Sequence, residues 1–208
     1  MESSFWKARW EANQIGFHEA AVHPMLLAHG ARLGNAGTVF VPLCGKSHDM
    51  AWLVAQGLAV TGIELSDIAV RAFFAEHGLP AQHTRLDGHD EYRAPGYRLL
   101  CGDFFALSRD TLGAFNAIYD RAALIALPPA MRRDYAATMS VLAAPATRML
   151  LVTVEYDTSV LSPPPFAVSA EEVSSLYGDS WDIEDLGTRA ADVKGQAGTE
   201  QAFWLTRR

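Results

Sequence analysis

The 208-residue sequence has little cysteine, no excess of basic charge and no long apolar run. Its two cysteines, Cys44 and Cys101, lie in apolar stretches without a second cysteine at metal-ligand spacing, which predicts buried thiols in a reducing compartment. A net charge of −7 counts against a nucleic-acid binder, which needs a basic face. No segment approaches the roughly 18 apolar residues of a membrane span, and the N-terminus lacks a signal-peptide stretch. We therefore expect a soluble, cytoplasmic protein with a small-molecule substrate and no nucleic-acid or membrane partner.

The composition itself is that of an ordinary globular protein, with 50% hydrophobic and 20% charged residues. A chain of this length fits one domain, and it buries on the order of 70% of its unfolded surface. We expect a single domain over residues 1–208, monomeric, in which residues 1–35 form N-terminal helices.

Strand and helix patterns alternate along most of the chain, which predicts an α/β fold with a parallel sheet covered on both faces. Residues 81–96 are polar and rich in turn residues, and we expect less regular structure there. The tail predicts an extended Pro-rich loop, a short helix and an antiparallel pair of strands. Expected strands lie at 38–43, 59–65, 97–101, 115–120, 148–154, 181–186 and 202–206, and expected helices at 4–13, 24–33, 47–56, 66–77, 129–142 and 170–177.

The ends of the first two expected strands carry the first functional signal. In a doubly wound sheet, ligands bind beyond the carboxyl ends of the strands, and Glu64 stands 19 residues after Gly45, where an acid accepts the hydroxyls of a ribose. A phosphate loop needs a glycine five residues before Gly45, where Phe40 stands instead. Because this turn is poor in glycine, it favours an adenosine ligand without phosphates, such as S-adenosylmethionine.

Two further strand ends agree with that ligand. Asp103 and Phe104 follow the third strand and offer an acid and an aromatic face for adenine, while Arg121 follows the fourth strand as a permanent cation for a carboxylate or an electron-rich substrate. Each residue also has a structural interpretation. Glu64 or Asp120 could cap a helix, Phe104 could be core, and Arg121 could pair with a surface acid.

The chain resembles the bacterial branch of the thiopurine S-methyltransferase family in a series of long, ordered motifs. They occupy residues 5–10, 13–18, 41–47, 62–66, 102–105 and 119–129. The similarity runs from residue 5 to about residue 187. It implies a class I methyltransferase fold, with a doubly wound, mostly parallel seven-stranded sheet, an antiparallel C-terminal hairpin and an N-terminal helical lid. It also implies S-adenosylmethionine as methyl donor and aromatic or heterocyclic thiols as acceptors.

The same resemblance places the donor-binding residues by position. They are Trp10, Leu43, Gly45, Glu64, Phe104 and Arg121. The sequence departs from the family at 187–201, which is short and rich in Gly, Ala and Thr where the family usually carries aromatic and basic residues near the acceptor. Acceptor identity is therefore less determined by the resemblance than donor identity.

Methyl transfer from a sulfonium is an in-line displacement that depends on positioning more than on acid–base chemistry. We expect Arg121 to act as the catalytic residue by favouring the thiolate form of an acidic aromatic thiol. Trp6, Trp10 and Phe17 would form an aromatic lid over a flat acceptor, although ordinary helix packing explains Trp6 equally well.

Three alternatives remain open at this stage. The chain could methylate small chalcogen nucleophiles, such as selenium or tellurium species, sulfide or halide, or it could bind S-adenosylmethionine as a sensor without turnover. An oxidoreductase fits less well because the pyrophosphate turn is missing. The histidines lack zinc-site spacing, so no metal is expected.

Overall fold

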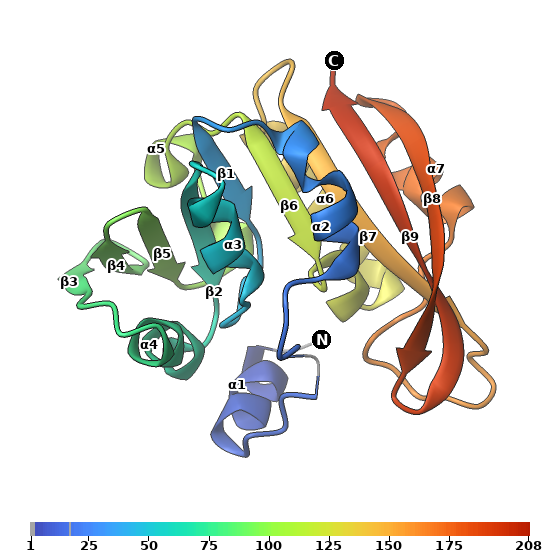
Figure 1. The fold of residues 1–208 in the computed structure, drawn as a ribbon, viewed down its shortest axis with the longest axis horizontal. Coiled ribbons are helices and arrows are strands. Elements are labelled where there is room, and N and C mark those ends of the chain that lie inside the picture. The colour runs from blue at the N-terminus through green and yellow to red at the C-terminus, as the bar shows by residue number, and fades with distance from the viewer. Residues whose placement is uncertain (1–2, 17) are drawn as a thin grey trace. The chain divides into compact units, whose positions relative to one another are not determined.

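The computed structural model describes residues 3–16 and 18–208. The chain forms two compact units, unit 1 (Met1–Phe115) and unit 2 (Asn116–Arg208). Their helices and strands are labelled in Figure 1.

Unit 1 is an α/β unit whose parallel strands are joined by helices. Its strands run in the order β3-β4-β5-β2-β1, with β1 parallel to β2 and β2 parallel to β5. The apolar runs predicted as central strands are buried on both faces, which is typical of parallel sheets. The elements are α1 (Ser3–Glu11), α2 (Pro24–His29), the 3-10 helix η1 (Gly30–Leu33), β1 (Thr38–Val41), α3 (Asp49–Ala55), β2 (Ala59–Glu64), α4 (Asp67–Glu76), β3 (Gln82–Arg85), β4 (Asp90–Ala94), β5 (Tyr97–Cys101), η2 (Phe104–Ala106) and α5 (Arg109–Leu112).

Strands β3 and β4 lie in the segment that the sequence predicted to be less regular. Both are antiparallel additions, β3 to β4 and β4 to β5, and they bring the described strands to nine instead of the expected seven. All four residues of β3 are exposed, so the strand has no alternation of apolar and polar residues to detect.

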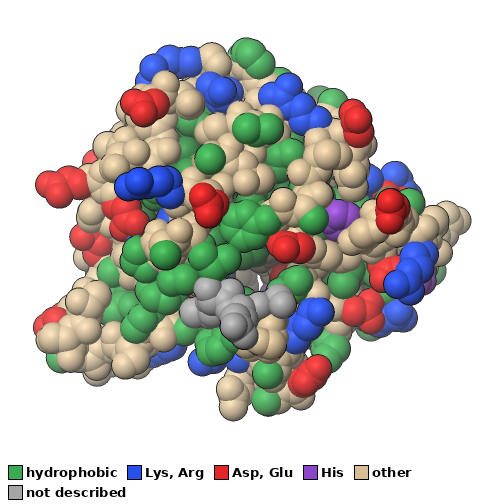
Figure 2. Space-filling view, turned by 180° about the vertical axis from the view of Figure 1, so that it is seen from behind, with side chains coloured by type: hydrophobic (Ala, Val, Ile, Leu, Met, Phe, Trp, Pro, Cys, Tyr) green, Lys and Arg blue, Asp and Glu red, His purple; other side chains and the backbone are tan. Residues whose placement is uncertain are grey.

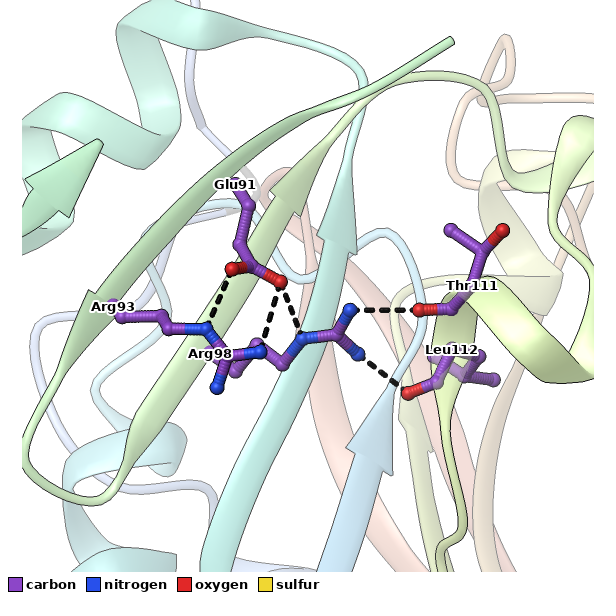
Figure 3. A network of polar contacts seen from close by, with 5 residues as sticks. All are labelled: Glu91, Arg93, Arg98, Thr111 and Leu112. Atoms are coloured by element: carbon purple, nitrogen blue, oxygen red, sulfur yellow. Dashed lines mark hydrogen bonds and ion pairs between the residues drawn. The ribbon is translucent and has the colours of Figure 1, made fainter. Parts of the chain in front are cut away.

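A network of ion pairs and hydrogen bonds holds the amino end of β5 (Figure 3). The buried Glu91 carboxylate accepts from Arg93 and from Arg98 Nε at 2.7 Å, and the Arg98 guanidinium donates to the carbonyls of Thr111 and Leu112. A cavity of about 540 Å³ opens beside Arg98 at the amino ends of β1, β2 and β5. Because these strands are parallel, this cavity is at the opposite end from the carboxyl-end residues predicted to bind the donor.

Unit 2 contains the remaining parallel pair and the antiparallel C-terminal hairpin. Its strands run in the order β6-β7-β9-β8, with β6 parallel to β7 and β9 antiparallel to both of its neighbours. Met139, Leu150, Trp181 and Leu205 belong to its buried core. The elements are β6 (Ala117–Arg121), the 3-10 helix η3 (Leu124–Ala126), α6 (Pro129–Leu142), β7 (Arg148–Tyr156), α7 (Ala170–Tyr177), β8 (Trp181–Val193) and β9 (Gln196–Arg207).

The C-terminal hairpin is much longer than the sequence predicted. Residues 187–201, which lie between the two strands predicted at 181–186 and 202–206, extend both strands to a two-residue turn, with a bulge between Asp185 and Thr188. The extended part of β9 stays paired with β7 as far as Gly198 opposite Tyr156. In this extension, hydrogen bonds between strands satisfy the backbone N–H and C=O groups of small residues. These residues have no alternating apolar pattern, which is why the sequence did not predict the extra length of the two strands.

Acidic and basic side chains are interspersed on the face of the molecule that Figure 2 shows. In the described part of the chain, no helix is both long enough and apolar enough to cross a membrane.

Candidate functional site

The turn after β1 has an unusual backbone. Leu43 adopts φ 46° and Gly45 φ 52°, both in the left-handed region, and Leu43 lacks the freedom of glycine there. The turn is anchored to β2 because Cys44 N donates to the Ile63 carbonyl at 3.0 Å. Strained residues of this kind concentrate at ligand-binding sites.

Glu64, the last residue of β2, is buried at 6% exposure directly beside this turn. One carboxylate oxygen accepts from Gly45 N at 2.9 Å and the other from Ser66 N at 2.8 Å. Burial raises the pKa of this carboxyl, and the backbone hydrogen bonds from Ser66, Gly45 and Leu65 oppose that rise. A carboxylate offers about four acceptor positions, so Glu64 can hold the turn and still accept hydroxyl groups from a ligand.

Trp10 packs against Gly45. A Cβ added to Gly45 would approach the Trp10 ring at 3.3 Å, and the Trp10 side chain is only 6% exposed. Helix α1, which carries Trp10, also contacts α4 (Figure 1). Trp6 packs edge-on against Phe5, with ring centroids 5.3 Å apart, and Phe17 lies outside the described residues.

Lys46 does not take the role of a phosphate-loop lysine. Its ammonium group pairs with Glu76 on α4 at 2.5 Å, and this hydrogen bond and charge hold the pKa of Glu76 below its ordinary value.

Phe104 begins η2 immediately beyond β5 and is 4% exposed. Its ring stacks on Phe40 at a centroid distance of 6.5 Å, and the neighbouring Phe105 meets it edge-on and is 38% exposed. Phe104 thus contributes to the core of unit 1, while Phe105 presents the accessible aromatic ring at this strand end. The predicted contact of Phe104 with adenine stays a prediction.

His89 is a residue of this region that sequence analysis missed. It is 6% exposed, its Nε2 lies 3.4 Å from the Asp103 carbonyl, and its Nδ1 is buried without a hydrogen-bond partner. Its ring also fills the space where a Cβ on Gly102 would stand, at 2.4 Å. His89 directly precedes strand β4, which was not predicted, so nothing in the sequence pattern indicated this contact.

Neither thiol is placed for nucleophilic chemistry. Burial raises the pKa of Cys44 well above its ordinary value and that of the half-buried Cys101 to about 11, so both thiols are protonated near neutral pH. Among the residues that the structure describes, no group of three His, Cys, Asp or Glu side chains is arranged to hold a metal ion. His23 instead caps α2 by accepting from Met25 N.

Arg121 ends β6 in unit 2 and is partly buried. The next residue, Ala122, has φ 66°, again a left-handed conformation without glycine. Asp120, fully buried, fixes this turn because its carboxylate accepts from Leu124 N at 3.2 Å and from the Tyr135 hydroxyl at 2.7 Å. Burial raises the pKa of Asp120 from 3.8 to about 6, against the opposing effect of these hydrogen bonds.

Within unit 1, therefore, the carboxyl ends of the parallel strands bring the predicted donor residues together. Gly45 is bonded to Glu64 and packed on Trp10, and Leu43 belongs to the same turn. Phe104 follows on the neighbouring strand end, where Gly102 N donates to the Glu64 carbonyl at 2.9 Å. Arg121 belongs to unit 2 and is held by its own turn.

Two solved methyltransferases have related folds. The 1,6-didemethyltoxoflavin-N1-methyltransferase of Burkholderia thailandensis, solved with S-adenosylhomocysteine, has a TM-score of 0.71 at 16% identity and covers 99% of this chain and 86% of its own. The magnesium protoporphyrin IX methyltransferase of Synechocystis PCC 6803, also with bound S-adenosylhomocysteine, has a TM-score of 0.69 at 12% identity over the full length of both chains. These similarities confirm the predicted α/β methyltransferase fold.

Sequence comparison is more specific. The family model described as thiopurine S-methyltransferase (TPMT) matches residues 1–206. A thiopurine S-methyltransferase of Pseudomonas aeruginosa is 50% identical over 197 residues, which cover 94% of this chain and 89% of the relative. One from Nitrosospira multiformis is 46% identical over 188 residues, covering 89% and 86% respectively. The chain belongs to the thiopurine S-methyltransferase family.

Proposed function

We propose that this chain transfers the methyl group of S-adenosylmethionine to the sulfur of thiopurines or other aromatic and heterocyclic thiols. The observation that carries the donor assignment is the buried Glu64 carboxylate, bonded to the Gly45 amide under the Trp10 ring. This arrangement presents acceptor oxygens, a strained turn and an aromatic wall at adjoining strand ends, which suits an adenosine without phosphates.

The donor supplies an electrophilic methyl group on a sulfonium. The residues of unit 1 bind and orient: Glu64 accepts from the ribose hydroxyls, Leu43 and Gly45 shape the turn, and Trp10 excludes water from it. Phe104 supports the adenine side through its packing on Phe40. Since an aromatic thiol is already partly ionised near neutral pH, no dedicated base is needed, and the guanidinium of Arg121 favours the thiolate.

We further propose that residues 1–208 work as one methyltransferase domain, with residues 1–35 as its lid, and that the enzyme is a cytoplasmic monomer. Two free thiols, Cys44 and Cys101, support a reducing compartment. Size-exclusion chromatography with light scattering measures the oligomeric state directly, and a stable dimer would contradict the proposal.

The activity is tested with purified full-length protein and a panel of acceptors. Donor-dependent methylation is measured with 6-mercaptopurine, thiophenol, sulfide and selenite, with S-adenosylhomocysteine binding measured in parallel by calorimetry. Turnover of the aromatic thiols is the expected result. Turnover of only sulfide or selenium species would replace the acceptor assignment, and donor binding without any turnover would indicate a sensor.

A further inference from the structure

The turn at the tip of the β8–β9 hairpin carries an unfavourable residue. Lys194 and Gly195 connect Val193 to its partner Gln196 with φ values of 53° and 81°. Two-residue hairpin turns with two positive φ values favour Asn, Asp or Gly at their first position, because a longer side chain is disfavoured in the left-handed region. Lysine at this position carries a local backbone cost that Asn, Asp or Gly would avoid.

The side chain of Lys194 reaches the loop between β7 and α7, residues 157–169, here called the β7–α7 loop. Its ammonium group donates to the carbonyl of the buried Pro164 and lies 3.5 Å from the carbonyl of Ser162. The Pro164 carbonyl is available for such a contact because residues 157–169 form no helix or strand, so no ladder hydrogen bond uses it. The hairpin tip therefore fastens one side of this loop.

The other side of the same loop is fastened to the turn that follows Arg121. Phe166 N donates to the Ile125 carbonyl at 2.7 Å, and the hydroxyl of Tyr156 donates to the Pro165 carbonyl. The buried Arg132 donates to the Ala167 carbonyl at 3.2 Å and stands 5.5 Å from the centre of the Phe166 ring.

These contacts join the hairpin tip to the functional end of unit 2. Strands β6 and β7 are parallel, with Arg121 opposite Val152, so the turn after Arg121 and the β7–α7 loop both follow carboxyl ends, where ligands of such sheets bind. The loop is rich in apolar residues, since Leu161, three prolines and the aromatic Phe166 follow one another closely. Such a surface matches a planar aromatic ring better than a small ion.

We propose that Lys194 is a positioning residue: it clamps the β7–α7 loop so that this loop forms a fixed apolar wall for the ring of a planar aromatic thiol. This proposal rests on the proposed function, and it identifies the β7–α7 loop as the segment that selects the acceptor. The clamp acts on the acceptor ring and leaves donor binding, which depends on unit 1, unchanged.

The test uses the full-length protein with Lys194→Asn, Lys194→Arg and the control Arg189→Gln. Asparagine removes the clamp and also suits the left-handed turn, so loss of function cannot be attributed to a damaged hairpin. Arginine keeps the cation. Arg189 is a second cation on the same hairpin, bonded at 2.6 Å to Glu200 on β9.

Each variant is characterised by its melting temperature, its calorimetric affinity for S-adenosylhomocysteine, its kcat and KM for 6-mercaptopurine and for sulfide, and amide hydrogen exchange of the non-proline residues between 160 and 167. For Lys194→Asn we expect faster exchange in this segment and a KM for 6-mercaptopurine raised roughly five-fold, the size of one exposed charge-assisted contact. The melting temperature stays equal or rises, while donor affinity and KM for sulfide stay unchanged. Lys194→Arg and Arg189→Gln behave as the wild type.

Wild-type exchange and wild-type KM in Lys194→Asn would overturn the clamp, as would a Lys194→Arg variant as impaired as Lys194→Asn. If the wild-type protein does not methylate 6-mercaptopurine, the proposed function fails, and the exchange comparison alone still decides whether Lys194 fixes the loop.

Discussion

Replacing Glu64 by alanine tests the donor site through two separate effects. The carboxylate is 6% exposed and accepts from the backbone of Gly45 at 2.9 Å and Ser66 at 2.8 Å, and both of these residues are buried. Its removal leaves two buried N–H groups unpaired, at ~1–3 kcal/mol each. Burial also raises the pKa of this carboxyl, so the folded state carries a desolvation cost that the alanine variant no longer has. We therefore expect a net loss of about 2 kcal/mol in the free energy of unfolding.

Donor affinity is also expected to fall, independently of the loss of stability, because the folded Glu64→Ala protein lacks the acceptor for the ribose hydroxyls. Loss of a charge-assisted hydrogen bond to the ribose costs roughly 1.5–3 kcal/mol, which corresponds to a fall in affinity of about ten- to a hundred-fold. Calorimetry with S-adenosylhomocysteine, which binds without turnover, measures this at a temperature where the variant is fully folded. Glu64→Gln keeps one acceptor oxygen but turns an amide N–H₂ toward the second backbone donor, so its stability should lie between the other two proteins.

Glu171→Ala is the matched control, since Glu171 is an exposed acid in the first turn of α7. It should cost less than about 1 kcal/mol and leave donor affinity unchanged. A folded Glu64→Ala protein with wild-type affinity for S-adenosylhomocysteine would refute the ribose assignment. An unchanged free energy of unfolding would refute the reasoning about the two buried amides.

The remaining predictions concern unit 2 and the lid. Because the pKa of Asp120 rises from 3.8 to about 6 on folding, its titration lowers the free energy of unfolding by up to ~3 kcal/mol as the pH rises from 4 to above 6. In Asp120→Asn this decline should vanish. An identical pH profile of the free energy of unfolding in both proteins would contradict the raised pKa of Asp120. Arg121→Lys should lose activity because lysine lacks the planar fork of the guanidinium, and Arg121→Ala should lose more. Lower donor affinity in these variants would assign the guanidinium to the methionine carboxylate of the donor, whereas unchanged donor affinity with a low kcat would assign it to the acceptor. Full activity of a folded Arg121→Ala protein would show that Arg121 forms an ordinary ion pair without a role in the reaction. Donor addition should change tryptophan emission and slow proteolysis between residues 5 and 20 as Trp10 closes on the donor, and equal cleavage rates with and without donor would exclude the lid.

The central strands and the donor turn were predictable because their signals are local. Strands β1 and β2 are short, mostly apolar segments bounded by turn residues. An acid at the end of β2 is a functional signal because ligands of such sheets bind at the carboxyl ends of the strands. Helix α6 was predicted with its observed bounds, from the proline at its first turn and a regular apolar face.

The parts that sequence analysis missed depend on partners distant in the chain. Glu91 is buried because Arg98 pairs with its carboxylate, and Arg98 is itself held by the carbonyl of Thr111. The residue pattern of β4 gives no indication of these partners. The length of the hairpin follows from its pairing with β7, which needs backbone groups and no particular side chains. His89 joined the candidate site for the same reason, through a strand that has little apolar signal.

The contact between Gly45 and Trp10 also limits how this sequence can diverge. Two independent conditions hold position 45: a backbone φ of 52°, and a ring 3.3 Å from where a side chain would start. A smaller residue at position 10 would relieve the second condition and leave the first untouched, so no single compensating change restores the freedom of position 45. Substitutions at position 10 in helix α1 should therefore be tolerated before substitutions at position 45 in the turn. A relative that has lost Trp10 is still expected to keep glycine at position 45.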